Sequence, residues 1–136
     1  MFEAIIEPGF SDTDALGHIN NTRLPVWFEN AREPIFRIFT PELDLQKWPL
    51  IVAHLAIDFT GQIYFGKAVK ITTEVEKIGN SSLTLRQCAW QADNCVAKSS
   101  AVMVHFDYVK NSSKQIPEEI RQTLKQHLIS PSAAEL

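Results

Sequence analysis

One strongly apolar helical segment followed by four long strand-like segments is the feature that most restricts the fold of this chain. Between about residues 22 and 39, apolar residues recur at three- and four-residue spacing, which is typical of a helix with one wide buried face. These residues are Leu24, Trp27, Phe28, Ala31, Ile35, Ile38 and Phe39. A helix this apolar needs a surface to cover it, and a curved antiparallel sheet wrapped around it provides one. The pattern therefore predicts an α+β fold.

The helical segment carries signals for its start and for an interruption. Asn20, Asn21 or Thr22 can cap the N-terminus, and Pro25 fits the first turn, where a missing N–H costs nothing. Pro34 removes a hydrogen bond in the middle of the segment. We therefore expect the helix to kink or split at Pro34.

Four segments alternate between apolar and polar residues with the period of a strand. In the first, Leu55, Ile57 and Phe59 continue an apolar face begun by Ile51 and Ala53, and His54 and Asp58 lie on the other face, which predicts a half-buried strand. Turn residues separate the later segments, so we expect three consecutive antiparallel hairpins. The four segments are residues 50–63, 69–78, 83–92 and 96–109, with turns at 79–81 and at Asp93-Asn94.

The two ends of the chain supply smaller elements. Residues 2–7 form a short apolar run that stops at Pro8-Gly9, which predicts a first strand. Residues 117–129 begin with Pro-Glu-Glu and carry an apolar stripe, which predicts a short amphipathic helix on the sheet edge. Residues 130–136 are expected to be frayed.

Composition narrows the class of protein. A chain of 136 residues with 45% hydrophobic content fits a single domain, residues 1–136, that needs no metal or disulfide. Thirteen basic and sixteen acidic residues give a net charge of −3 without a basic cluster, so nucleic acid is not an expected partner. No signal peptide or membrane-length apolar run is found, which favours a cytoplasmic protein without a membrane partner. Cys88 and Cys95 are expected to be free thiols, and no clustered ligand set predicts a metal or cofactor.

A polar stretch, residues 12–21, leads directly into the apolar helix. It places the carboxylates of Asp12 and Asp14 in a loop, Gly17 at a tight turn, and then a helix N-terminus with unpaired N–H groups. A carboxylate beside such a helix end suits acyl transfer, because the N–H groups can stabilise an oxyanion. The same residues can also simply cap turns and the helix, and spacing alone favours that interpretation.

The run SDTDALGHINNTRLPVWFENAR, residues 11–32, resembles the signature of the hotdog-fold acyl-CoA thioesterases of the 4-hydroxybenzoyl-CoA thioesterase-like family. The shared features are an Asp-x-Asp, a Gly-His-x-Asn-Asn and a helix with Glu-x-x-Arg. The resemblance continues through the segments HLAIDF, YFG, IGNSS and IPEE, and covers the chain from about Ile6 to Leu128. It implies a hotdog fold, an antiparallel sheet wrapped around one central helix, and hydrolysis of an acyl-coenzyme A thioester to free acid and CoA.

The resemblance also implies roles for individual residues. Asp14 matches the catalytic carboxylate, acting as general base or as nucleophile, and the backbone N–H of Asn21 matches the group that polarises the thioester carbonyl. Glu29 and Arg32 match a helix pair that we interpret as a structural ion pair. The residues expected to contact substrate are Gly17, His18, Asn20, Leu24, Asp58 and Thr60, with the segment around residues 58–61 contributed by a partner subunit.

The resemblance implies a homodimer, or two such dimers paired as a homotetramer, because the family's active site lies between two subunits. Leu24 and Lys67 depart from the family pattern, since a tyrosine and an acidic residue are usual there. His54, His105 and His127 are interpreted as packing or surface residues. Two other functions stay open: a thioesterase acting on acyl carrier protein, and a non-catalytic acyl-CoA-binding hotdog module.

Overall fold

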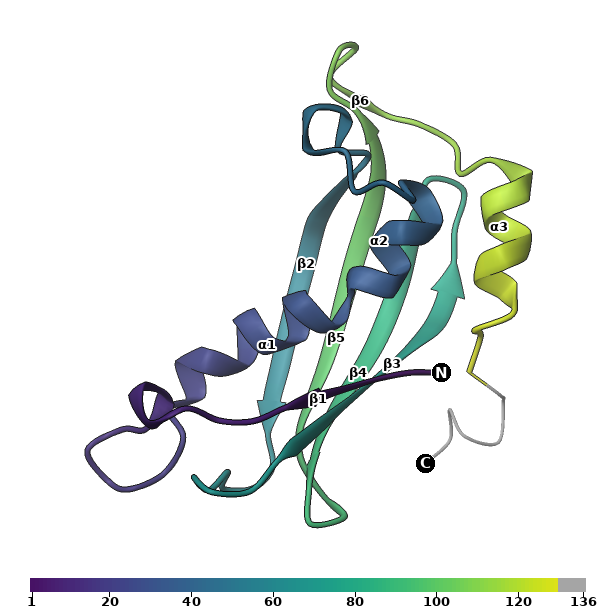
Figure 1. Cartoon of the computed structure of the whole chain (residues 1–136). Coiled ribbons are helices and arrows are strands. Elements are labelled where there is room, and N and C mark those ends of the chain that lie inside the picture. The colour runs from purple at the N-terminus through teal and green to yellow at the C-terminus, as the bar shows by residue number, and fades with distance from the viewer. Residues whose placement is uncertain (130–136) are drawn as a thin grey trace.

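The sheet and its helices are seen in a computed structural model that describes residues 1–129 (Figure 1). Helices α1 and α2 lie across one face of an antiparallel sheet, and α3 lies beside β3. This is the hotdog fold that the sequence predicts. In chain order the elements are β1 (Phe2–Ile6), α1 (Leu24–Ala31), α2 (Glu33–Phe39), β2 (Leu50–Phe59), β3 (Val69–Ile78), β4 (Ser82–Gln91), β5 (Asn94–Asp107), β6 (Ser112–Ser113) and α3 (Glu118–Lys125).

The order of strands in the sheet corrects one expectation. The order is β1-β3-β4-β5-β2, with β6 paired to β5. The β3/β4 and β4/β5 hairpins form as predicted, but the expected hairpin between β2 and β3 is wrong, because β2 pairs with β5. Residues 60–68 are too long for a tight hairpin turn and carry the chain from one edge strand to the other side of the sheet. Strand β2 is therefore left at an edge.

The β4/β5 turn lies one residue earlier than predicted. Its central residues are Ala92 and Asp93, which both have positive φ, at 50° and 65°. Two left-handed residues make the mirror-image turn that matches the twist of paired strands. Asn94 already belongs to β5 and pairs with Gln91.

Strand β2 contains a bulge that the sequence pattern did not predict. The register with β5 shifts between Val52 and His54, which leaves Ala53 as the extra residue. Beyond the bulge, Leu55 and Phe59 face α1, and Asp58 takes the other face as predicted. The bulge resets the alternation, so the expectation that Ile51 shares the face of Leu55 is wrong. The prediction of a half-buried strand is also wrong for a single chain, since most β2 side chains are exposed.

The helical segment splits as predicted, but slightly ahead of the proline. Arg32 lies between α1 and α2 with ψ near −4°, and Pro34 stands in the first turn of α2. There its missing N–H removes no helical bond. Pro25 likewise occupies the first turn of α1. A 3₁₀ turn, Asn21–Arg23, precedes α1 and is capped by the Asn20 side chain.

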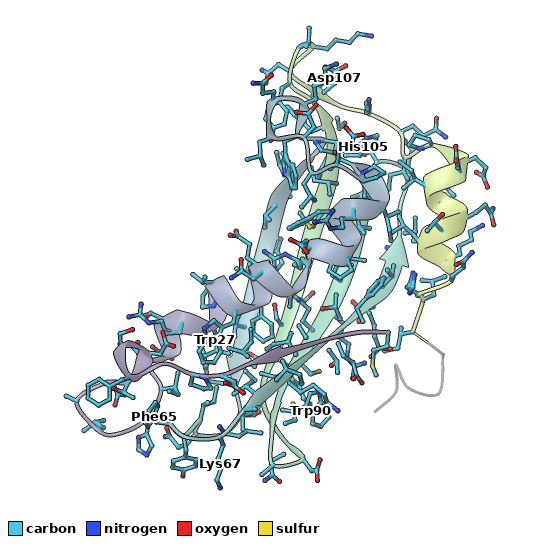
Figure 2. The ribbon with its side chains drawn as sticks, in the orientation of Figure 1. Trp27, Phe65, Lys67, Trp90, His105 and Asp107 are labelled. Atoms are coloured by element: carbon cyan, nitrogen blue, oxygen red, sulfur yellow. The ribbon has the colours of Figure 1, made fainter. Side chains whose placement is uncertain are left out.

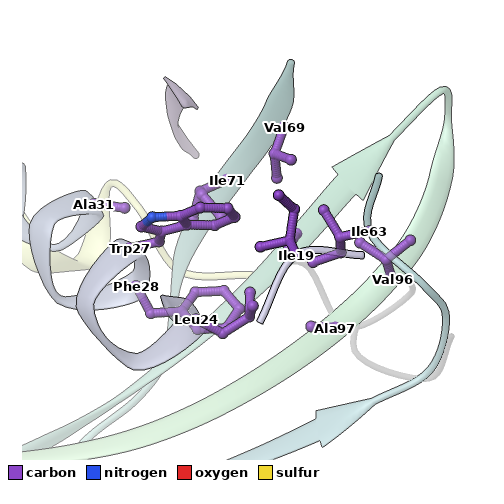
Figure 3. Close-up of a cluster of buried hydrophobic side chains, with 11 residues drawn as sticks. Ile19, Leu24, Trp27, Phe28, Ala31, Ile63, Val69, Ile71, Val96 and Ala97 are labelled. Atoms are coloured by element: carbon purple, nitrogen blue, oxygen red, sulfur yellow. The ribbon is translucent and has the colours of Figure 1, made fainter. Parts of the chain in front are cut away.

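The core consists of two apolar clusters under the helices. Trp27 lies in one of them, and His105 lies towards the other end of the molecule (Figure 2). The first cluster fills the space between α1 and the sheet (Figure 3). Its members are Ile19, Leu24, Trp27, Phe28, Ala31, Ile63, Val69, Ile71, Ala89, Val96 and Ala97. The second cluster is centred on Ile35, Leu50, Val75, Leu85, Met103 and Leu124. Two buried polar residues, Thr73 on β3 and Gln87 on β4, lie opposite each other in the sheet and separate the two apolar clusters.

The remaining boundaries differ from the predictions by a few residues at the ends of β1, β2 and α3. Cys88 and Cys95 are free, as expected. The expectation of a frayed end concerns residues 130–136, which lie outside the described residues. Within residues 1–129, no helix is long and apolar enough to cross a membrane.

Candidate active site

Asp12 holds the start of the loop together. Its Oδ2 accepts a hydrogen bond from the Gly9 N–H at 2.8 Å, and its Oδ1 lies 3.1 Å from Arg23 Nε. Arg23 also donates to the Ser11 carbonyl at 3.0 Å. Both carboxylate oxygens of Asp12 are therefore engaged in fixing the loop against the turn before α1.

Asp14 has one oxygen engaged and one left over. Its Oδ1 accepts hydrogen bonds from the backbone N–H groups of Leu16, at 2.8 Å, and His18, at 3.2 Å. The Asp14 N–H donates to the His18 carbonyl at 2.7 Å, which closes the turn. Within the described residues, Oδ2 makes no hydrogen bond. Asp14 thus caps a turn, as the structural interpretation requires, and still has a carboxylate oxygen available for chemistry.

Gly17 allows this turn to close. Its φ is +84°, a left-handed conformation that residues with a Cβ adopt only at a cost. His18, next along the chain, bridges to Tyr64, and the two rings meet edge to face at 5.4 Å between centroids. The Ile19 N–H donates to the Ile63 carbonyl at 2.8 Å. The polar loop is therefore fastened to the segment that follows β2.

The helix start is arranged beside this turn. The Asn20 side chain accepts hydrogen bonds from the Thr22 N–H at 2.9 Å and the Thr22 hydroxyl at 2.8 Å. The Asn20 N–H donates to the Asp12 carbonyl at 2.7 Å. Asn21 is exposed, and its own N–H finds no acceptor in the described part of the chain, as is usual for the first residue of a helical turn. This amide is free to bind an oxygen atom of a ligand.

A pocket of about 410 Å³ lies between the helix start and the end of β2. Its lining is Ile19, Asn21, Leu24, Phe59, Thr60, Gly61, Gln62 and Ile63. Three of the predicted site residues line the pocket, namely Asn21, Leu24 and Thr60. Four others lie in the polar loop before α1 and are not part of this lining, namely Asp14, Gly17, His18 and Asn20. Asp58 is not brought to this pocket by its own chain: it pairs with Lys98 on the sheet face away from α1.

The expected ion pair between Glu29 and Arg32 is wrong. Within residues 1–129, no carboxylate lies within 4.0 Å of the Arg32 guanidinium. Arg32 lies at the break between α1 and α2, and its side chain is buried between the helices and the sheet. There its Nη1 donates to Gln87 Oε1 at 3.2 Å. Burial lowers the pKa of Arg32 from its usual value, and the more distant charge of Glu29 opposes this shift in part.

Sequence reasoning missed Gln91, which lines an adjoining pocket and fixes Tyr64 and Lys67 in the wall of that pocket. Its amide donates to the carbonyls of Tyr64, at 2.9 Å, and Lys67, at 3.2 Å, and its Oε1 accepts from the Tyr64 N–H at 2.9 Å. Only 4% of Gln91 is exposed. The signal was available in the sequence, because Gln87 and Gln91 fall on the apolar stripe of β4, where a polar side chain needs a buried partner.

A second pocket, of about 450 Å³, adjoins the first and shares Thr60, Gly61 and Gln62 with it. Its lining is more polar and includes Lys67 and Asn94. Lys67 and the neighbouring Phe65 lie at the same end of the molecule as the polar loop (Figure 2). Among residues 1–129, no three histidine, cysteine, aspartate or glutamate side chains gather as a metal site.

The curled antiparallel sheet with its central helix defines a hotdog protein. A family model described as the Thioesterase-like superfamily matches residues 8–124, and the chain belongs to this family. Family membership supports thioesterase activity.

Individual relatives agree with this assignment. A structure described as a predicted thioesterase from Bacillus stearothermophilus is 39% identical, with a TM-score of 0.92, and the match covers 96% of this chain and 98% of that one. A thioesterase from Thermus thermophilus, complexed with coenzyme A and Zn, is 26% identical with a TM-score of 0.81, covering 90% and 96%. The uncharacterized protein YsmA of Bacillus subtilis is 26% identical over 117 residues, which is 85% of this chain and 79% of that protein.

Proposed function

We propose that this protein is an acyl-CoA thioesterase in which Asp14 is the catalytic carboxylate. The observation that carries the proposal is the unengaged Oδ2 of Asp14, held by a turn that leads into the free amide of Asn21. The Asn21 N–H polarises the thioester carbonyl, and the pocket lined by Leu24 and Phe59 receives part of the acyl group. Gly17, His18 and Asn20 position these groups.

The reaction has two possible routes through Asp14. As a general base, the carboxylate takes a proton from water while the water oxygen attacks the carbonyl carbon, and collapse of the tetrahedral intermediate expels the CoA thiolate. As a nucleophile, the carboxylate attacks the carbonyl and expels the thiolate, and water then hydrolyses the mixed anhydride. A single turnover in isotope-labelled water distinguishes the routes, because only anhydride hydrolysis can place labelled oxygen in the Asp14 side chain.

Coenzyme A is the proposed carrier of the acyl group. The second pocket, with Lys67 in its lining, continues from the first and offers a cation to a phosphate-bearing ligand. The coenzyme A bound to the Thermus thermophilus thioesterase supports the same choice. An acyl carrier protein is the alternative carrier, and a non-catalytic acyl-CoA-binding module is the alternative class.

We also propose that the protein works as a homodimer formed through β2, with a homotetramer as a further step. Val52, Leu55 and Phe59 turn apolar side chains towards the helix side of the sheet, yet they are 44%, 39% and 51% exposed. In the part of the chain that the structure describes, the same strand also has an unpaired edge. A second copy of β2 covers both features, and it brings the partner's Asp58 and Thr60 near the junction between the subunits.

The test of the activity is thiol release from a panel of acyl-CoA esters of graded chain length and from an acylated carrier protein, each at equal concentration. We expect turnover of at least one CoA ester in metal-free buffer and weak turnover of the carrier protein. Binding of acyl-CoA without thiol release would favour the non-catalytic module, and a preference for the carrier protein would overturn the choice of coenzyme A.

The test of the dimer is light scattering on Leu55→Asp. This change places a charge in the proposed interface, and we expect a folded monomer with strongly reduced turnover. Val109→Asp is the matched control, because Val109 is 96% exposed in the turn after β5 and is not part of the exposed apolar face of β2. A Leu55→Asp protein that stays dimeric would contradict an interface through β2.

A further inference from the structure

Among residues 1–129, no counter-ion contacts the buried guanidinium of Arg32. Arg32 is 2% exposed, and Gln87, its hydrogen-bond acceptor, is neutral. Gln87 is itself fixed, since its amide donates to the Phe28 carbonyl at 2.9 Å and to Thr73 Oγ1 at 3.0 Å. The Nε atom of Arg32 is buried and has no partner among the described residues. A buried cation of this kind is costly unless an acceptor reaches it.

Arg32 also lines a pocket of about 360 Å³ that is separate from the two at the polar loop. Most of the wall is apolar and comes from Phe36, Trp48, Leu50, Val52 and Met103. Small-molecule sites commonly combine apolar walls with a few fixed polar groups, and an arginine fork suits a carboxylate. This pocket therefore matches an aliphatic chain that ends in a carboxylate.

Two carboxylates of the protein itself lie at this pocket, and neither neutralises Arg32 by contact. Glu33 lies 3.6 Å from Arg37 Nε, so its charge is paired on the surface of α2. Glu29 is exposed to solvent and is not within ion-pair distance of Arg32. Solvent screens the charge of an exposed side chain more strongly than that of a buried one. The buried guanidinium therefore remains the dominant charge for a group that enters the pocket.

The pocket and the candidate active site lie at opposite ends of the exposed face of β2. Phe59 lines the active-site pocket, Leu50 and Val52 line the Arg32 pocket, and Leu55 lies between them. Antiparallel pairing of two β2 strands about a two-fold axis places the end of one strand beside the beginning of the other. In a dimer with this pairing centred near Leu55, the active-site pocket of one subunit would lie next to the Arg32 pocket of its partner.

We propose that Arg32 selects thioesters whose acyl group carries a carboxylate at its far end. The inference rests on the proposed function, and it makes Arg32 a determinant of specificity rather than a member of the catalytic machinery. The thioester carbonyl binds at Asn21 of one subunit, the aliphatic chain follows the junction between the two β2 strands, and the distal carboxylate binds the guanidinium of the partner subunit's Arg32.

The test compares octanoyl-CoA with the mono-CoA thioester of octanedioic acid on the wild-type protein, Arg32→Met and Lys125→Met. Met keeps an unbranched side chain, and Lys125 is an exposed cation on α3 that does not line the Arg32 pocket. We expect the wild type to favour the carboxylated ester by about tenfold or more in kcat/KM. Arg32→Met should lower that value by about 10- to 100-fold and leave octanoyl-CoA within about threefold, and Lys125→Met should change neither.

Binding of free octanedioate and octanoate, measured by calorimetry, provides a readout that does not depend on hydrolysis. Tighter binding of octanedioate that Arg32→Met abolishes supports the inference even if no ester is hydrolysed, and in that case only the proposed activity fails. Equal values for the two esters and the two acids on the wild type would overturn the inference while leaving the thioesterase proposal intact. If Arg32→Met no longer dimerises but keeps the same acyl preference, the guanidinium binds a carboxylate of the second copy and not one of the substrate. That result would also overturn the inference.

Discussion

Replacing Gln91 with leucine tests whether a buried glutamine holds the wall of the second pocket, which adjoins the candidate active site. Leucine is similar in size, so the change removes hydrogen bonds without leaving a large cavity. The side chain makes three hydrogen bonds to the backbone of Tyr64 and Lys67. All three fasten Tyr64 and Lys67, which line the second pocket together with Gln91 itself.

The magnitude follows from the number of bonds and their burial. A net contribution of about 0.5–1.5 kcal/mol for each bond gives about 1.5–4.5 kcal/mol for the three. Tyr64 and Lys67 are exposed residues, so water can reach part of the freed backbone after the substitution. We therefore expect Gln91→Leu to lower the free energy of unfolding by about 2–3 kcal/mol.

Urea denaturation followed by circular dichroism measures this change, and amide exchange at Tyr64 shows whether the segment has loosened. Gln122→Leu is the matched control, because its amide makes one exposed hydrogen bond to Glu118 on α3 and the substitution should cost less than about 0.5 kcal/mol. A Gln91→Leu protein as stable as the control, with unchanged exchange at Tyr64, would refute the structural role of Gln91.

Two further predictions concern the turn and the pH dependence of stability. Gly17→Ala introduces a Cβ at φ +84°, where a residue with a Cβ is strained even though the new atom has open space around it. We expect the free energy of unfolding in urea to fall by about 1–2 kcal/mol and turnover to fall several-fold. Unchanged values would show that the turn tolerates alanine. Burial lowers the pKa of His105, which favours its neutral form in the folded state. The stabilisation from neutral His105 should therefore be fully present above the unfolded pKa of about 6.5 and be lost as the pH drops below it. The free energy of unfolding of His105→Asn should depend less on pH in this range. An unchanged pH dependence in the variant would show that His105 is not its cause.

The main helix and strands were predictable because helix and strand periods are local properties of the sequence, and the hotdog fold was implied by the resemblance to a known family. Strand β3 matches its predicted boundaries, and the helix splits close to Pro34 as its chemistry requires. The pairing of β2 with β5 was not predictable from hairpin signals, because it depends on how residues 60–68 cross the molecule. The bulge at Ala53 also has no local signal, since alanine fits either strand face.

The candidate site was predictable only in part for a similar reason. Asp14, Gly17 and Asn20 act through bonds to neighbours within four residues, which a motif can show. Gln91 acts across 24 to 27 residues, and Arg32 meets a partner 55 residues away. The Arg32 side chain lies under the helix break, a position that the helical spacing of Glu29 and Arg32 did not suggest.

The turnover of Asp14→Asn, measured against Asp12→Asn, tests the central claim most directly. Asparagine keeps the size of Asp14 and an oxygen that can accept from Leu16 and His18, so a residue that only caps a turn should tolerate it. If the free carboxylate oxygen performs the chemistry, kcat should fall by about 10²- to 10⁴-fold while circular dichroism and light scattering stay unchanged. Asp12→Asn, which loses the charge that faces Arg23, should be milder. A folded Asp14→Asn protein with near wild-type turnover would contradict the account.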